Sequence, residues 1–428
     1  MTNKNNLDPH NNDGVKPVAF PVVDESTLDA LSKHEDNLNS LGVEMMNLQN
    51  LASFIETKPS LEMFNYALNK YGLTQSISVE DINKSAQVVW DRTKLNLRRY
   101  QSELFSYAKI INSGAERAVE RLEMLYEMAG NVQKDPYTET ITVNKNKKYG
   151  IDGVFEPKDI RPLMGQTQNI FDFYDKVLLN YMKDVDQVIL KVELDHKWTD
   201  DTLMKFEKYS AQKWMSNYIE VKEPDERFRV SSLLVHSVVC QNNKAIYYSG
   251  PTEAKTETIK DWQFMVNTIR RFKLKYYTVP GMKPVNEEDN QVQVDNPNSI
   301  KQRINFILGT ASRIKNRVGY DKKISAELRK LEVDCEKLRN KTRTIRTEVK
   351  PGVGEEETTP GKPPVSDIVK DLVAIMNSMT RLVTDYNNCL AGQLRLIGAL
   401  GYVADLELKA FEAPIKKPTE ETVEKTDI

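Results

Sequence analysis

The chain contains few of the residues from which metal and enzyme sites are usually built. Its 428 residues include only three cysteines and four histidines. The cysteines, Cys240, Cys335 and Cys389, lie far apart and form no CxxC pair, so the sequence encodes neither a zinc site nor a disulfide framework. It also lacks a Walker loop, a dinucleotide-binding glycine motif and an HExxH motif. These absences predict no metal, no cofactor and no enzymatic activity.

Long apolar runs and an excess of charge of one sign are absent as well. The uncharged stretch "LIGALGYVA" has nine residues, well short of the roughly 20 that span a bilayer. The amino-terminal "MTNKNNLDPHNNDGVKPVAFP" lacks the apolar core of a signal peptide. With 60 basic and 62 acidic residues, the net charge argues neither for nor against nucleic acid. We therefore expect a soluble protein that is made in the cytoplasm and does not contact a membrane.

Apolar residues at helical spacing, in contrast, are abundant. Between Val79 and Ala129 they recur about every 3.6 residues. This row consists of Val79, Ile82, Ala86, Val89, Thr93, Leu97, Tyr100, Leu104, Ala108, Ile111, Ala115, Ala118, Leu122, Leu125 and Ala129. It predicts one helix on the order of 75 Å long, capped by Ser78 and ended by Gly130, with Gly114 as a candidate kink. Such a helix is suited to lateral packing.

A second row of the same kind lies near the carboxyl end. It consists of Ile368, Leu372, Ile375, Met379, Leu382, Tyr386, Leu390, Leu394, Ile397, Gly401, Ala404, Leu408 and Phe411. The same stretch contains Gly392, Gly398 and Gly401, and each glycine inside a helix costs about 1 kcal/mol relative to alanine. We expect a compensating close approach of another helix, either in this chain or in another copy.

The fold predicted from these patterns is mainly α, an elongated bundle of long amphipathic helices with a small mixed α/β central region. Proline, glycine and acidic residues in "VKPGVGEEETTPGKPPV" indicate a linker between two helical segments. We divide the chain into a flexible arm (1–25), amino-terminal helices (26–134), the mixed region (135–280), a linker (281–298), a basic helical hairpin (299–348), the acidic Pro/Gly linker (349–365), a carboxyl-terminal long helix (366–412) and a flexible tail (413–428).

The mixed region combines short strands with helices. "TETITV" alternates as a strand does, and "RVSSLLVHSVV", "QNNK" and "AIYYSG" predict a hairpin. Helices are expected near residues 168–192, 202–219 and 257–277. In the following segment, residues 299–348 are helical in pattern with a break near Gly319 and Tyr320.

Charge is concentrated in one part of the chain. Between Lys301 and Lys350 there are 15 basic and 6 acidic residues. The candidate phosphate contacts are Arg313, Lys315, Arg317, Lys322, Lys323, Lys337, Arg339, Lys341, Arg343 and Arg346. Lysine and arginine in this number can neutralise phosphates without reading bases. The alternative is a solvated bundle face whose charges are paired with acidic neighbours.

Two weaker patterns suggest chemistry. Asp195, His196, Asp200 and Asp201 resemble a metal-ligand cluster, but they stand at a junction between helices, where such residues usually serve as caps. His236 and Cys240 have the spacing of residues on one face of a strand, without a third group to orient the histidine. We expect neither the His236 and Cys240 pair nor the cluster of Asp195, His196, Asp200 and Asp201 to be catalytic.

The layout of the chain is similar to that of a known family. The short helix "SLEMFNYALNKYGL", then "SVEDI", a long helix with a tryptophan, and a final helix around "DYNNCLAGQLRLIGAL" resemble the internal head and virion structural proteins of giant tailed phages of the phiKZ-like type. The resemblance implies a non-enzymatic protein inside the capsid beside the genome. It also implies other virion or capsid proteins as partners, non-specific contact with DNA and trimming by a phage protease.

Three other interpretations remain open. The first is a helical scaffold or adaptor that binds proteins and never meets DNA. The second is a helical pore-forming toxin whose hairpin around residues 233–239 enters lipid, although His236 and Ser237 interrupt its apolar face. The third is an enzyme whose residues converge only in space. Self-association through the long helices is compatible with a scaffold, with a toxin and with a virion protein.

Overall fold

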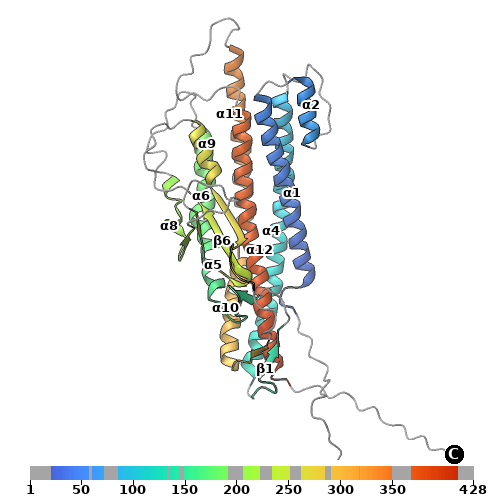
Figure 1. Cartoon of the computed structure of the whole chain (residues 1–428), viewed down its shortest axis with the longest axis vertical. Coiled ribbons are helices and arrows are strands. Elements are labelled where there is room, and N and C mark those ends of the chain that lie inside the picture. Colours follow the sequence, from blue (N-terminus) through green and yellow to red (C-terminus); the bar gives the residue numbers. More distant parts are fainter. Residues whose placement is uncertain are drawn as a thin grey trace, which may run out of the picture.

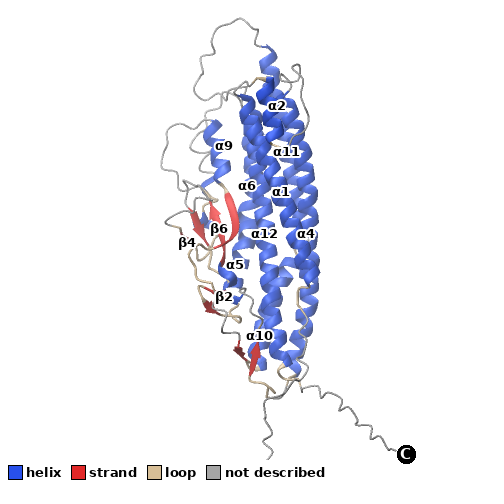
Figure 2. Ribbon diagram, turned by 45° about the vertical axis from the view of Figure 1, so that its right-hand side comes forward, coloured by secondary structure: helices blue, strands red, loops and turns tan. Residues whose placement is uncertain are grey.

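The computed structural model describes residues 21–56, 60–71, 85–132, 135–143, 149–190, 206–221, 234–250, 262–284, 291–317, 319–348 and 368–412. Long helices run along the longest axis of an elongated body, and short strands lie on one flank (Figure 1, Figure 2). The prediction of a mainly α fold with a small mixed region is confirmed.

Helix α12 (Ile368–Lys409) forms the centre of the bundle. It contacts α1 (Glu25–Glu56), α4 (Ser85–Asn131), α10 (Pro297–Lys315) and α11 (Tyr320–Glu348). All members of its predicted inner row are buried. Burial extends to most of the remaining positions of the helix, including Asp371, Asp385 and Glu407. Thus α12 is a core helix enclosed on nearly all sides, whereas the sequence pattern predicted an amphipathic one.

The same helix is long and apolar enough to cross a membrane by length and composition. Its most apolar window is 72% buried inside the bundle. Burial of this extent is typical of the core helix of a helical bundle, because a membrane-spanning helix presents apolar side chains to lipid.

Helix α4 is continuous over 47 residues, so Gly114 does not divide it. The start predicted at Ser78 lies outside the described residues. The inner row from Val89 to Ala129 is buried, including its polar member Thr93, whose hydroxyl donates to the carbonyl of Val89 at 2.8 Å. Helix α1 packs on both α4 and α12. Helix α2 (Leu61–Lys70) is capped by Ser60, whose hydroxyl accepts from the Met63 amide at 3.3 Å.

Helices α10 and α11 are separated by the predicted break, where Gly319 has a φ of +106°. Asn296 caps α10 by accepting from the Ser299 amide at 2.9 Å. The two helices follow one another along the long axis (Figure 1). Both contact α12, but α10 packs mainly on α4 and α11 packs mainly on α6 (Leu179–Leu190). The hairpin expected for residues 299–348 is therefore wrong. The short turn preserves the direction of the chain instead of reversing it.

The central region forms the strand-bearing flank. Its helical elements are α5 (Arg161–Asp172), the π-helical turn η2 (Phe173–Leu178), α6, α8 (Ala211–Trp214) and α9 (Trp262–Arg271). Antiparallel pairs are formed by β1 (Thr140–Thr142) with β8 (Gln291–Gln293), and by β2 (Gly150–Ile151) with β3 (Val154–Phe155). The strand expected in "TETITV" is thus present.

A four-stranded antiparallel sheet has the order β4–β5–β6–β7. Its strands are β4 (Ile219–Glu220), β5 (Leu234–His236), β6 (Lys244–Ser249) and β7 (Lys273–Thr278). The predicted hairpin is confirmed as β5 and β6, joined through the turn η3 (Gln241–Asn243). Asn242 and Asn243 adopt positive φ in this turn, a conformation that asparagine tolerates better than most residues.

The helix predicted for residues 257–277 is only partly correct. Helix α9 ends at Arg271, and β7 then pairs with β6 along its whole length, from Ser249 opposite Lys273 to Lys244 opposite Thr278. The helix expected up to Ile219 also gives way to β4. In both places, pairing with a neighbouring strand outweighs the local helical pattern.

Candidate functional site

The ten predicted phosphate contacts divide by burial. Arg313, Lys322, Lys323, Lys337 and Lys341 are exposed and Lys315 is half-buried, whereas Arg317 and Arg339 are buried. The side chains of Arg343 and Arg346 lie outside the described residues. Six of the ten side chains can therefore reach a partner in solution, and they follow α10 and α11 along the bundle.

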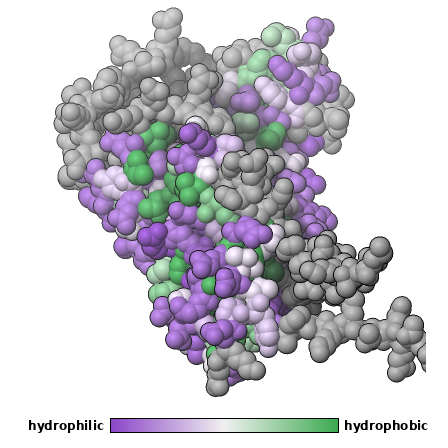
Figure 3. Space-filling view, turned by 60° about the horizontal axis from the view of Figure 1, so that its bottom comes forward, coloured by the Kyte–Doolittle hydropathy of each residue, from purple (hydrophilic) through white to green (hydrophobic). Residues whose placement is uncertain are grey.

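Neighbouring groups orient some of these six cations. The Arg313 guanidinium lies over the Phe171 ring at 4.4 Å and donates to Gln168 at 3.1 Å. Lys337 pairs with Asp334 at 2.8 Å. Over the described surface of the face seen in Figure 3, hydrophilic residues predominate and apolar ones form small separate groups.

Arg317 is fully buried and serves the interior of the bundle. It donates to Asn112 at 3.3 Å, to Asp321 at 3.0 Å and to Asn387 at 3.1 Å, and its guanidinium lies 5.5 Å from the centre of the Tyr386 ring. These contacts join α4, α11 and α12 at one point. Because Arg317 is fully buried, a phosphate in solvent has no access to its guanidinium group.

Arg339 has a similar role near the other end of α11. It is 3% exposed, donates to Gln87 at 2.5 Å and lies 5.3 Å from the Trp90 ring centre. The Trp90 indole N–H in turn donates to Glu336. Together these residues connect α11 to α4. The interpretation of 299–348 as a nucleic-acid interface consequently rests on the six accessible cations.

A further set of buried charges surrounds the end of α12. Glu407 is fully buried and pairs with Lys158 at 2.8 Å and with Arg303, and it accepts from the Asp295 amide at 3.0 Å. Charge-assisted hydrogen bonds of this kind are about twice as strong as neutral ones. They attach α10 and the segment before α5 to the central helix.

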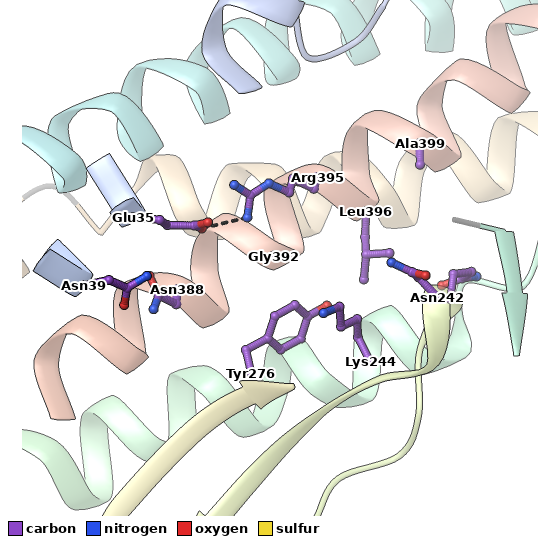
Figure 4. A pocket seen from close by; sticks show the side chains of 11 residues that line it. Glu35, Asn39, Asn242, Lys244, Tyr276, Asn388, Gly392, Arg395, Leu396 and Ala399 are labelled. Carbon is purple, nitrogen blue, oxygen red and sulfur yellow. Dashed lines mark hydrogen bonds and ion pairs between the residues drawn. The ribbon is translucent and has the colours of Figure 1, made fainter. Parts of the chain in front are cut away.

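A hollow of about 230 Å³ lies between α1, α12, the turn η3 and β7. Figure 4 shows the side chains that line it. Glu35 and Arg395 form an ion pair at 2.7 Å on one side, and Lys244 and Tyr276 lie on the other. Burial, followed by the charge of Arg395, lowers the pKa of Lys244. Because Glu35 is held by Arg395 and also accepts from the Tyr107 hydroxyl at 2.7 Å, the hollow offers polar contacts but no free carboxylate base.

The cysteine and histidine of the central region are not arranged for catalysis. His236 is buried, and its Nδ1 lies 2.8 Å from the backbone carbonyl oxygen of Ser237. Burial raises the pKa of the Cys240 thiol well above its ordinary value, as it does for Cys335 and Cys389. Since the thiolate is the nucleophile, all three are held in an unreactive form at neutral pH.

The metal-like cluster Asp195, His196, Asp200 and Asp201 lies outside the described residues. Within the part of the chain that the structure describes, no three His, Cys, Asp or Glu residues are grouped so that they could hold a metal ion. The β5 strand of the hairpin proposed to enter lipid is buried, and it is paired on both sides in the four-stranded sheet.

A family model for phiKZ-like phage internal head proteins matches residues 25–406. The chain belongs to this family. The match extends from the first residue of α1 almost to the end of α12 and therefore covers the whole helical bundle. Neither the curated proteins nor the solved structures include a match to this chain.

Membership of the phiKZ-like internal head proteins confirms the resemblance found in the sequence. It places the protein inside the virion head, following synthesis in the host cytoplasm, and gives it a structural role in the virion. The buried contacts of Arg317, Arg339 and Glu407 were not predictable from the sequence, because their partners lie far away along the chain and follow no motif.

Proposed function

We propose that the protein is a non-enzymatic structural component that lies beside the packaged genome and contacts DNA phosphates without sequence preference. The observation that carries this proposal is the set of accessible cations on α10 and α11. Lys315, Lys322 and Lys341 form no ion pair with another described residue, whereas Arg317 and Arg339 of the same segment are buried and donate hydrogen bonds to groups of the bundle. Cations that are not neutralised within the protein gain most from neutralising DNA phosphates.

The rest of the molecule supports a mechanical role. Buried polar groups such as Arg317 and Glu407 hold helices to one another, and the thiols are kept protonated by burial. A rod stabilised in this way along its length keeps its shape under the crowding of packed DNA. Other virion proteins, and further copies of the chain, are the expected protein partners.

A second candidate is an adaptor that binds proteins and does not meet DNA. It is favoured by large apolar side chains that α4 exposes to solvent, since exposed apolar groups mark contact surfaces when they cluster. These are Leu95, Phe105 and Met124, which are 55%, 51% and 53% exposed. Their wide separation along α4 makes this surface discontinuous, and we therefore prefer the DNA-proximal role.

Salt-dependent binding to duplex DNA tests the proposal. We expect Lys315→Gln, Lys322→Gln, Lys323→Gln and Lys341→Gln together to weaken binding uniformly across sequences. The slope of log affinity against log salt should fall by up to about 0.9 for each phosphate that the variant no longer neutralises. A matched variant removes four exposed lysines from other helices: Lys33, Lys70, Lys109 and Lys213. Equal weakening in both variants, or no binding by the unmodified protein, would favour the adaptor.

A further inference from the structure

A second hollow in the bundle is lined by cations on one side of α12. It measures about 440 Å³ and lies between α1, α9, β7 and α12. Its charged lining residues are Arg270, Arg271, Lys273 and Arg381, and its polar ones are Gln49, Asn50, Asn267, Asn377 and Ser378. Among the described residues that line it there is no carboxylate.

The sequence positions explain why these cations meet. Arg270 and Arg271 occupy the last turn of α9, and Lys273 begins β7 directly after it. Asn377, Ser378 and Arg381 lie within one turn of α12 and therefore share a face of that helix. Strand β7 and helix α9 both pack on α12, which brings the two sets of side chains to one place.

The three arginines of the hollow are not bonded to a carboxylate of any described residue. The guanidinium groups of Arg270, Arg271 and Arg381 form no hydrogen bond or ion pair with another described residue. The carboxylate of Asp385, one turn after Arg381, is bonded to Lys275 at 2.8 Å, and it interacts with Arg381 and Lys273 only through charge. Burial, followed by the charges of Arg381, Lys275 and Arg270, lowers the pKa of Lys273. An anion would relieve this repulsion.

A buried amide provides an independent observation. Asn377 is 5% exposed and lines the hollow, and its Oδ1 has no hydrogen-bond partner. Its Nδ2 donates to Gln49 Oε1 at 3.4 Å. Rotating both amides by 180° keeps a hydrogen bond between them and replaces the unpartnered Asn377 oxygen by a donor nitrogen. The lining of the hollow thus combines arginine and lysine side chains with amides.

We propose that this hollow binds a phosphate group. Arginine presents planar pairs of N–H donors that fit phosphate oxygens, lysine adds a mobile charge, and the amides and Ser378 supply neutral hydrogen bonds. A concave site lined by charge of one sign also concentrates anions from solution. The site goes beyond the proposed DNA contacts, because it is formed by α1, α9, β7 and α12 rather than by the lysines of α10 and α11.

Two sources could supply the phosphate: a free polyphosphate or the backbone of DNA. Calorimetric titration of the full chain with inorganic pyrophosphate, and separately with a short DNA duplex, distinguishes them. We expect saturable binding of pyrophosphate, weakened about tenfold or more by Arg270→Gln combined with Arg381→Gln, because two charged hydrogen-bond donors are removed. If this double substitution weakens binding of the duplex as well as of pyrophosphate, the site binds backbone phosphate. If the affinity for the duplex is unchanged, the site binds free phosphate.

The matched control is Arg99→Gln combined with Arg329→Gln, which removes two exposed arginines elsewhere and should change pyrophosphate affinity by less than about twofold. Arg270 and Arg381 are themselves exposed, so an unchanged melting curve is expected for both variants. Absence of saturable pyrophosphate binding, or equal weakening in both variants, would overturn the proposal. If the protein binds pyrophosphate in this hollow but does not bind DNA, the proposed function is refuted and the proposed phosphate site is not.

Discussion

Individual charged side chains in this protein are buried together with their partners. Arg317 and Glu407 are both fully buried, and each is met by groups from two or more other elements. Removing one partner from such a set leaves a charge without compensation in the interior, which typically costs about 3–5 kcal/mol. The bundle therefore depends on a few polar contacts as well as on its apolar rows.

We expect Arg317→Ala to lower the free energy of unfolding by about 3 kcal/mol or more, because Asp321 and Asn387 lose their donor. Urea denaturation followed by circular dichroism measures the change. Lys322→Ala, on the exposed side of α11, is the control and should cost less than about 0.5 kcal/mol. Similar effects for the two substitutions would show that Arg317 contributes no more than a surface charge.

Asp186 predicts a dependence of stability on pH. Burial and the neighbouring Asp334 carboxyl raise the pKa of Asp186 from 3.8 to about 6, although Lys330 also contacts it. Between these two values the folded state holds more protons at Asp186 than the unfolded state does. The free energy of unfolding contributed by this group therefore falls as pH rises through that window.

The measurement is urea denaturation of the wild type and Asp186→Asn at a series of pH values from about 4 to about 7. Asparagine does not titrate, so the stability of the wild type relative to the variant should decrease as pH rises. Asp334 titrates below this window, because hydrogen bonds from Asp186 and Lys337 lower its pKa despite its burial. A constant difference between the two proteins would contradict the raised pKa of Asp186.

The burial of single charges was the feature that the sequence disclosed least. Arg317 lies in the same basic stretch as Lys315 and Lys322, and nothing local distinguishes it from them. What buries it is the arrival of Asn112 and Asn387 from two other helices. Composition gave the correct charge excess, but only the packing of distant elements determines which of these charges face water.

Glycines of α12 lie where neighbouring segments pack closely against the helix. A Cβ added to Gly392 on α12 would lie 2.1 Å from Cε1 of Tyr276 on β7, and one added to Gly401 would lie 2.6 Å from Cγ2 of Val22. The close approach expected at these glycines is therefore present within the chain, but the expectation that a helix makes it is wrong: at Gly392 and Gly401 the neighbours are a strand and the segment before α1. A close approach between two helices occurs at Gly114 of α4, where an added Cβ would lie 2.8 Å from Cδ2 of Leu394 on α12.

We expect Gly392→Ala to destabilise the protein by about 1–3 kcal/mol, because the new methyl group forces Tyr276 to move. Gly309→Ala is the matched control, since Gly309 lies inside α10 with nothing within 4 Å of its added Cβ. That substitution should stabilise the protein by about 0.4–1 kcal/mol. Thermal melts of the two variants compare them directly, and a shift of the same sign in both would refute close packing at Gly392.

At the scale of elements, apolar periodicity located the long helices because their packing repeats every turn. The rows in α4 and α12 are buried almost without exception. The short elements of the flank were less predictable: β7 follows α9 after a single residue, and its strand conformation is set by pairing with β6. The direction of α11 relative to α10 likewise depends on four residues at the break.

The whole molecule is a rod organised around one buried helix. Apolar contacts with α12 unite the amino-terminal helices, the strand-bearing flank and the basic helices in one hydrophobic core. This arrangement spreads exposed charge along a long body. Such a body suits the virion structural role that its family indicates, and it is compatible with the proposed contacts with DNA.

Protease treatment of purified phage particles, followed by mass spectrometry, is the most decisive experiment on the place of this protein in the virion. We predict peptides from the whole matched region, residues 25–406, in intact particles. These peptides should survive protease added outside the head and disappear once the genome has been released and the head opened. Absence of the chain from particles, or its digestion while the heads are intact, would contradict a structural role beside the genome.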